Sequence, residues 1–259
     1  MAERFIKTYS QGVMNVTEIW ADRETGVNYI YHAAGNGAGL TPLLNRDGTP
    51  VITTVFEEKE CPMKLLFVDC WISQRGEESR TRALAEAYLE AYLNCHPEAD
   101  LETVIPEELL ALAPFDVEML SERDALARSG RFDDHVFDMA RQFREADAVV
   151  VAAPYWDMSY PAALKTYIEH ISAVGLTYHY EMDGAHGDCQ AQHLVYLTSG
   201  GDFEHEDSIG VLHWRQLCGL FGVKRFDYVF AGGLDIDPAM TPDLMEGACA
   251  LARKLAETI

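Results

Sequence analysis

Apolar and polar residues follow two different patterns along the chain, and the pattern changes near residue 62. Before that point, short β-prone runs are separated by turns rich in Gly, Asp and Asn, which predicts a small all-β domain over residues 1–62. The acidic segment 57–60, followed by Pro62, is typical of a linker. The expected strands of this domain are Ile6–Tyr9, Val13–Trp20, Asn28–His32 and Val51–Phe56.

Residues 63–259 instead alternate apolar, strand-like runs with amphipathic, helix-like segments. This alternation predicts an α/β fold in which a parallel sheet carries helices on both faces. Five main strands favour the flavodoxin-like order 2-1-3-4-5, whose ligand lies at the carboxyl ends of the strands. The expected strands are Lys64–Val68, Leu101–Val104, Ala148–Ala153, His193–Thr198 and Lys224–Ala231, with a short extra strand at Thr177–Tyr180. The expected helices are Ser79–Leu93, Asp133–Glu145, Pro161–Ile171, Ile209–Phe221 and Thr241–Thr258, and residues 106–130 form a polar excursion with local helical signals.

The composition narrows the classes of function. The 259 residues carry a formal net charge of −22, which disfavours binding to nucleic acids and to anionic membrane surfaces. No apolar stretch is long enough to span a membrane, and the N-terminus shows no signal-peptide pattern. Six scattered cysteines without a C-x-x-C pair are typical of thiols in a reducing compartment, so we expect a cytoplasmic protein.

The first strand-to-helix loop of the α/β part carries candidate phosphate ligands. Ser79, Arg80 and Thr81 offer two hydroxyls and a guanidinium at the start of a predicted helix, and Ser73 lies in the same loop. A helix N-terminus with such donors is suited to bind a phosphate group. An equally good interpretation is that Ser79 only caps the helix. The sequence of a phosphate-binding Walker loop is absent.

Two further loops follow predicted strands at the same edge of the sheet. The segment Pro154-Tyr155-Trp156-Asp157-Met158 places two large aromatic side chains after the central strand, where they either face a flat ligand or pack between loop and helix. The segment Ser199-Gly200-Gly201 allows the backbone to approach a ligand closely, although it is also compatible with a simple turn.

Four segments together resemble one protein family. Ala153–Met158 and Pro161–Glu169 are similar to the A-P-M-Y-N-F…L-K-x-Y-F-D signature of FMN-dependent NAD(P)H azoreductases and quinone oxidoreductases. Ala173–Tyr180 is similar to A-G-x-T-F-x-Y, and Thr198–Gly201 is similar to T-S-R-G-G. The segments Thr25–Tyr29 and Gly39–Leu44 resemble a small uncharacterised bacterial domain, which adds no function.

The resemblance implies a homodimer with one FMN per subunit, in which NADH or NADPH is the co-substrate. It implies transfer of a hydride through the flavin to a small aromatic acceptor, which is a quinone, an azo compound or a nitro-aromatic. Ser73 and Ser79–Thr81 then correspond to the phosphate loop, Pro154–Met158 to the loop against the isoalloxazine, and Ser199–Gly201 to the pyrimidine edge. No side chain is expected to act catalytically by itself, and Trp156 and Tyr180 are candidates for the acceptor pocket. The alternative is a non-enzymatic flavin-binding electron carrier or sensor, because one fold hosts many functions.

The sequence departs from the family pattern at four places, one of which is a phosphate loop that is about two residues longer around Ser73. Asp157 stands where the family usually has Asn, and an acid beside the flavin would disfavour the anionic reduced form and lower its reduction potential. Tyr155 and Trp156 replace a Met–Tyr pair, which changes the expected shape of the acceptor pocket. The Arg of T-S-R-G-G is missing, because Gly200 stands in its place.

Histidine and cysteine side chains gather in one short segment. His179, His186, Cys189 and His193 are residue types that bind zinc, but their spacing fits no standard zinc motif. We therefore favour a solvated loop, predict no metal, and keep open a role for one histidine in the acceptor pocket.

Overall fold

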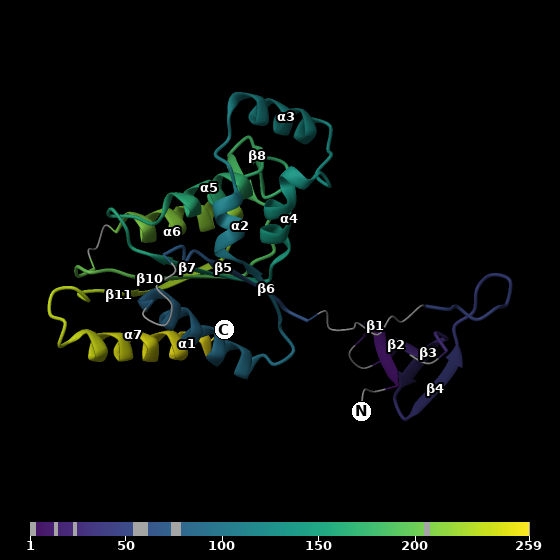
Figure 1. Cartoon of the computed structure of the whole chain (residues 1–259). Coiled ribbons are helices and arrows are strands. Elements are labelled where there is room, and N and C mark those ends of the chain that lie inside the picture. Colours follow the sequence, from purple (N-terminus) through teal and green to yellow (C-terminus); the bar gives the residue numbers. More distant parts are fainter. Residues whose placement is uncertain are drawn as a thin grey trace. The chain divides into compact units, whose positions relative to one another are not determined.

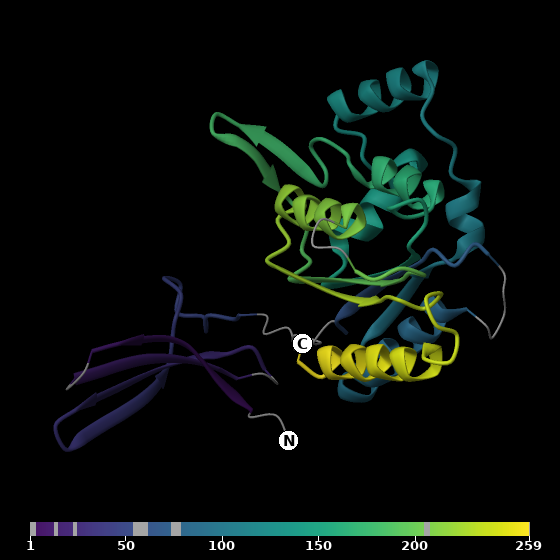
Figure 2. The ribbon, with the colours of Figure 1, turned by 90° about the vertical axis from the view of Figure 1, so that its left-hand side faces the viewer.

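The computed structural model describes residues 4–12, 15–22, 25–53, 62–73, 79–204 and 208–258 (Figures 1 and 2). The chain divides into two compact units, Met1–Cys61 and Pro62–Ile259. The acidic segment 57–60, which the sequence suggests as a linker, lies outside the described residues.

The N-terminal unit contains a four-stranded antiparallel sheet in which each strand pairs with the next. Its strands are β1 (Phe5–Gln11), β2 (Asn15–Asp22), β3 (Asn28–Ala34) and β4 (Gly37–Pro42). A two-residue turn with Gly35 at a φ of +58° joins β3 to β4, a conformation that glycine adopts without steric cost.

The fourth strand of this sheet differs from the sequence prediction. The glycines around residue 37 suggest a turn, but only Gly35 and Asn36 form one, and the next residues continue as β4. In the predicted strand Val51–Phe56, Ile52 forms only an isolated bridge to Val27, and residues 54–56 lie outside the described residues. The turn predicted over Gly35–Gly39 was wrong, because small residues without β propensity can still pair as a strand when a tight turn aligns them.

The C-terminal unit has a five-stranded sheet in the order β11-β10-β7-β5-β6, and every pairing in it is parallel. When these five strands are numbered 1 to 5 along the chain and the sheet is read from β6, the order is the predicted 2-1-3-4-5. The flavodoxin-like fold is therefore confirmed. The strands are β5 (Lys64–Asp69), β6 (Asp100–Val104), β7 (Ala148–Pro154), β10 (His193–Ser199) and β11 (Arg225–Ala231).

Helices cover both faces of this sheet (Figure 1). Along β7, Val149 and Val151 pack in the core on one face, whereas Val150 and Ala152 pack on the other, which explains the uninterrupted apolar run of this strand. The first face carries α2 (Pro106–Ala111), α4 (Asp138–Glu145), α5 (Ala162–Ile171) and α6 (Ile209–Phe221). The second face carries α1 (Arg80–Cys95) and α7 (Thr241–Ala256).

Two smaller features lie outside the sheet. The helix α3 (Val117–Arg128) and the 3-10 turn η2 (His135–Phe137) fill the polar excursion and the start of the next predicted helix. A hairpin of β8 (Tyr178–Glu181) and β9 (Gly184–Gly187) stands where the sequence predicts one short strand and a loop. Among the described helices, none combines the length and the apolar character that are needed to cross a membrane.

Candidate functional site

A cavity of about 400 Å³ opens where the loops after β5, β7, β10 and β11 meet. This volume falls in the range of small-molecule sites. Ten of the eleven lining residues belong to the three loops that the sequence singles out. The lining residues are Ser73, Ser79, Arg80, Thr81, Pro154, Tyr155, Trp156, Ser199, Gly200, Gly201 and Asp235.

One side of the cavity is formed by the start of α1. Ser79 is the N-cap, and its hydroxyl accepts a hydrogen bond of 3.3 Å from the backbone N–H of Arg82. The capping interpretation of Ser79 is therefore correct, and the same residue also lines the cavity. The N–H groups of a first helical turn have no carbonyl partner within the helix, which makes this side favourable for an anion.

The start of α1 is tied to the loop after β10 by a buried hydrogen bond. The hydroxyls of Thr81 and Ser199 lie 2.6 Å apart, and both side chains are buried. The backbone N–H of Tyr155 in turn donates to the carbonyl of Ser199 at 2.9 Å. These two bonds hold the three loops against one another and so define the wall of the cavity.

Two glycines make room on the side of the loop after β10. A Cβ on Gly200 would lie 3.1 Å from the Phe230 ring and 3.3 Å from the Tyr155 side chain. A Cβ on Gly201 would lie 2.3 Å from the Asp235 carboxylate, closer than real Cβ contacts. A side chain at either position would have to displace a neighbour, and at position 201 that neighbour is the Asp235 carboxylate, which goes beyond the simple turn that the sequence left open.

Aromatic side chains close the remaining wall. The Tyr155 ring packs edge-on against Phe230 with 5.2 Å between centroids, whereas Trp156 is 40% exposed at the cavity. Asp157 and Met158 do not line the cavity, although the sequence groups them with Trp156. They occupy a tight turn at φ values of +49° and +65°, which directs them to solvent. Such left-handed backbone is strained for Met and is found at functional sites more often than elsewhere.

Asp235 is the lining residue that the sequence analysis missed. It lies in the loop after β11, and its carboxylate accepts a hydrogen bond of 2.7 Å from the Arg80 guanidinium. Its backbone N–H donates to the carbonyl of Gly201 at 3.0 Å, which fixes the loop beside the cavity. The signal that could have found it is its place just beyond Gly232-Gly233, since every loop at the carboxyl edge of a parallel sheet is a candidate.

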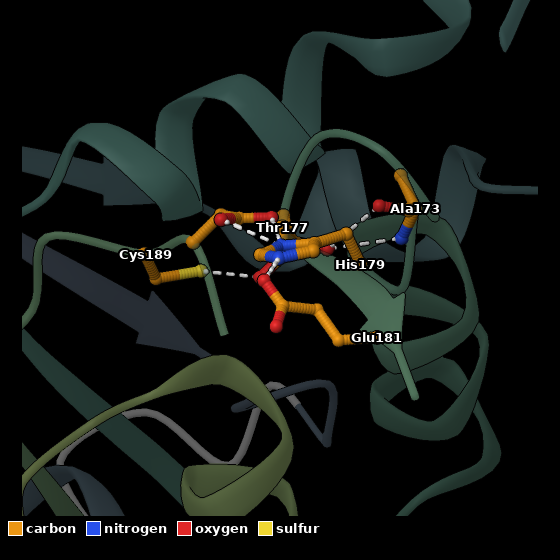
Figure 3. Close-up of polar contacts among 6 residues, drawn as sticks. Ala173, Thr177, His179, Glu181 and Cys189 are labelled. Carbon is orange, nitrogen blue, oxygen red and sulfur yellow. Dashed lines mark hydrogen bonds and ion pairs between the residues drawn. The ribbon is translucent and has the colours of Figure 1, made fainter. Parts of the chain in front are cut away.

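The four histidine and cysteine side chains of the segment 179–193 have different hydrogen-bond partners. His179 lies between two carboxylates, with Nδ1 2.9 Å from Asp188 and Nε2 3.3 Å from Glu181 (Figure 3). These contacts, above all that with Asp188, raise the pKa of His179. The Cys189 thiol instead donates to the carbonyl of Thr177 at 3.5 Å, and burial raises its pKa to about 12.

The other two histidines have separate partners. His186 contacts Asp183 at 2.8 Å, and the ligand atoms of Glu181, Asp183 and His186 lie within 4.8 Å of one another on the exposed hairpin. His193 is buried at the start of β10 and contacts Asp227 at 2.8 Å. The hairpin residue Tyr180 is 66% exposed and does not line the cavity of this chain.

Comparison with known proteins identifies the family. Residues 63–255 match the model of a family described as having a flavodoxin-like fold. The chain belongs to this family. Residues 4–53 match DUF6440, a family of unknown function, so the resemblance of both parts of the chain is confirmed.

Several curated proteins of this flavodoxin-like type are similar to the chain. The FMN-dependent NADH:quinone oxidoreductase 2 of Clostridium acetobutylicum is 32% identical over 182 residues, which cover 67% of this chain and 88% of the relative. The FMN-dependent NADH:quinone oxidoreductase of Clostridium beijerinckii is 28% identical over 201 residues, which cover 75% of this chain and 98% of the relative.

Solved structures support the same fold. The azoreductase of Bacillus anthracis strain Sterne superposes with a TM-score of 0.67 at 23% identity, over 76% of this chain and all of that chain. An FMN-dependent NADH-azoreductase of Bacillus anthracis in complex with FMN gives a TM-score of 0.65 at 17% identity, over 76% of this chain and 98% of that chain.

Proposed function

We propose that this protein is an FMN-dependent NADH oxidoreductase that reduces quinones or azo compounds. The observation that carries the proposal is the meeting of ten sequence-predicted residues from three loops around one cavity. The named activities of the similar proteins support it, since they are FMN-dependent NADH:quinone oxidoreductases.

The chemistry of the cavity fits FMN. Its α1 side presents hydroxyls, a guanidinium and a helix N-terminus, which suit a phosphate monoester. Tyr155 and Trp156 also line the cavity, and their rings suit a flat heteroaromatic ring. Bound FMN would supply the hydride chemistry, while the chain supplies binding, orientation and exclusion of water.

Each group of residues has a defined part in this proposal. Ser73, Ser79 and Thr81 would offer hydroxyl groups to the phosphate, and Arg80 would contribute the positive charge. Tyr155 and Trp156 would hold the ring and exclude water from it. Gly200 and Gly201 bring backbone close to the ring edge, because no side chain occupies that space.

The proposal extends to the two substrates and to the assembly. NADH is the donor, and the acceptor stacks near Trp156, whose exposed ring is available to a flat aromatic molecule. We also propose a homodimer, which is supported by exposed apolar side chains in the loops near the cavity. These side chains are Trp156, Met158 and Phe203. In this homodimer Tyr180 would line the acceptor pocket of the partner copy. Analytical ultracentrifugation, which measures the oligomeric state, tests the homodimer.

A cytoplasmic location is part of the same proposal. The five cysteines in the described part of the chain are free thiols, which suits a reducing compartment. We keep the two predicted domains, residues 1–62, of unknown role, and residues 63–259, to which we assign the proposed flavin site.

The visible spectrum of the purified protein, recorded before and after addition of NADH under argon, tests the function. A flavin band that bleaches with NADH and returns with menadione is the expected result. A bound flavin that neither NADH nor NADPH reduces would favour the carrier or sensor alternative. A colourless protein that cannot be reconstituted with FMN would overturn the proposal and leave only the fold.

A further inference from the structure

The cavity contains one cation and one carboxylate among its described lining residues, and they are paired with each other. The Arg80 guanidinium donates to Asp235 at 2.7 Å. This pair joins the start of α1 to the loop after β11. Among the described lining residues, the positive charge that would attract an anion is therefore already engaged.

The backbone of Asp235 is held beside the cavity. Its backbone N–H donates to the carbonyl of Gly201, and its side chain occupies space that any Cβ at position 201 would invade. The Asp235 side chain is nevertheless 68% exposed, and that of Arg80 is 38% exposed. A pair this exposed contributes little stability, so it can open and close readily.

We propose that Asp235 competes with the phosphate group of the ligand for Arg80 and so determines how tightly a phosphate monoester is held. The inference rests on the proposed function, because it takes the phosphate of FMN to bind at the start of α1. In the structure the Arg80 guanidinium is held by the Asp235 carboxylate. When the phosphate binds, Arg80 exchanges one anionic partner for another, and the Asp235 carboxylate remains nearby as a repelling charge.

This arrangement predicts a cofactor that exchanges rather than one that is held permanently. Binding yields no additional ion pair, because the pair between Arg80 and Asp235 is broken as the pair with phosphate forms. A phosphate monoester carries about −1.5 to −2 charges at neutral pH, so the neighbouring carboxylate disfavours it further. A flavin without a phosphate does not compete for Arg80 and is not affected.

The experiment compares FMN with riboflavin, using quenching of flavin fluorescence to measure both dissociation constants. Asp235→Asn removes the charge and keeps the size, so we expect FMN to bind about threefold to tenfold more tightly. Riboflavin is expected to bind the variant and the wild type equally. Asp237→Asn is the matched control, because it removes the same charge from the same loop at a residue outside the cavity lining.

The salt dependence provides a second readout. In the wild type one ion pair replaces another, so the site itself adds little to the salt dependence that the negative field of the chain gives to both proteins. In Asp235→Asn the phosphate gains an ion pair that was not there before, so affinity falls more steeply as salt is added. In an Arg80→Gln background the benefit of Asp235→Asn is expected to shrink, because no guanidinium is left to release.

The outcomes separate this inference from the proposed function. Weaker FMN binding by Asp235→Asn would mean that the carboxylate holds Arg80 in place for the phosphate, and it would overturn the inference alone. An equal gain for riboflavin, or for Asp237→Asn, would overturn it as well, because the effect would not depend on the phosphate or on the site. A wild type that binds neither flavin would overturn the proposed function and this inference with it.

Discussion

The hydroxyls of Thr81 and Ser199 form the buried contact that joins two loops of the cavity. Replacing Thr81 with Val keeps the shape of the side chain and leaves the Ser199 hydroxyl without this partner. A buried polar group that loses its partner costs about 1–3 kcal/mol. We therefore expect Thr81→Val to lower the free energy of unfolding by about 1–2 kcal/mol, measured by urea denaturation.

Thr81→Ser is the matched control, because it keeps the hydroxyl and removes only a methyl group. We expect it to retain most of the stability that Thr81→Val loses. Equal losses in the two variants would show that the methyl group, rather than the hydrogen bond, matters at this position.

Two histidines are expected to respond to pH with opposite signs. Burial lowers the pKa of His193 below its ordinary value of 6.5, so its contribution to stability is present above that value and is lost as pH falls. Contacts with Asp188 and Glu181 raise the pKa of His179, so its contribution is present at low pH and is lost as pH rises.

Urea denaturation at several values between about pH 7.5 and about pH 5.5 tests these signs. Without the buried histidine, His193→Gln should lose less stability on acidification than the wild type. Without the paired cation, His179→Gln should lose more stability on acidification. If both variants lost more stability on acidification than the wild type, or both lost less, the opposite pKa shifts of His193 and His179 would be contradicted.

At the scale of elements, β9 lies against the end of α6. A Cβ on Gly187 would stand 2.0 Å from the backbone carbon of Phe221 and from the backbone nitrogen of Gly222. Because backbone cannot move aside as a flexible side chain can, we expect Gly187→Ala to lower the free energy of unfolding by about 3 kcal/mol or more.

Gly219 in α6 offers the matched comparison. It is exposed, nothing lies near its Cβ position, and its φ is not in the left-handed region. We expect Gly219→Ala to raise the stability by about 0.5–1 kcal/mol, because alanine loses less backbone entropy in a helix. Thermal and urea unfolding of both variants would measure the difference, and a Gly187→Ala protein as stable as Gly219→Ala would refute the close contact.

The same contact shows what the sequence could and could not predict about elements. The uninterrupted apolar run Ala148–Ala153 predicts a strand covered on both faces. The structure confirms this, because every residue of the run is buried. Nothing local in Gly184–Gly187 indicates a strand, since this pairing is fixed by the hairpin and by the end of α6. Likewise, Ser79 and Gly200 carry local signals for the site, whereas the role of Asp235 arises only when the loop after β11 meets Arg80.

At the scale of the whole molecule, every lining residue of the cavity lies in the second unit. We therefore expect a chain that begins at Pro62 to bind FMN with the same affinity as the full chain. Fluorescence quenching measures the affinity, and circular dichroism checks that the shortened chain is folded. A folded shortened chain with weaker FMN binding would mean that the N-terminal unit contributes to the flavin site.

The net charge of −22 bears on the choice of nucleotide. NADPH carries about two more negative charges than NADH near neutral pH, because of its additional phosphate. The negative field of the chain therefore disfavours NADPH more strongly, and added salt screens this difference. We expect kcat/KM for NADH to exceed that for NADPH most clearly at low ionic strength, and the ratio to fall as salt is added. A preference for NADPH at low salt would contradict this view, because it would require a local positive site for the additional phosphate that outweighs the charge of the whole chain.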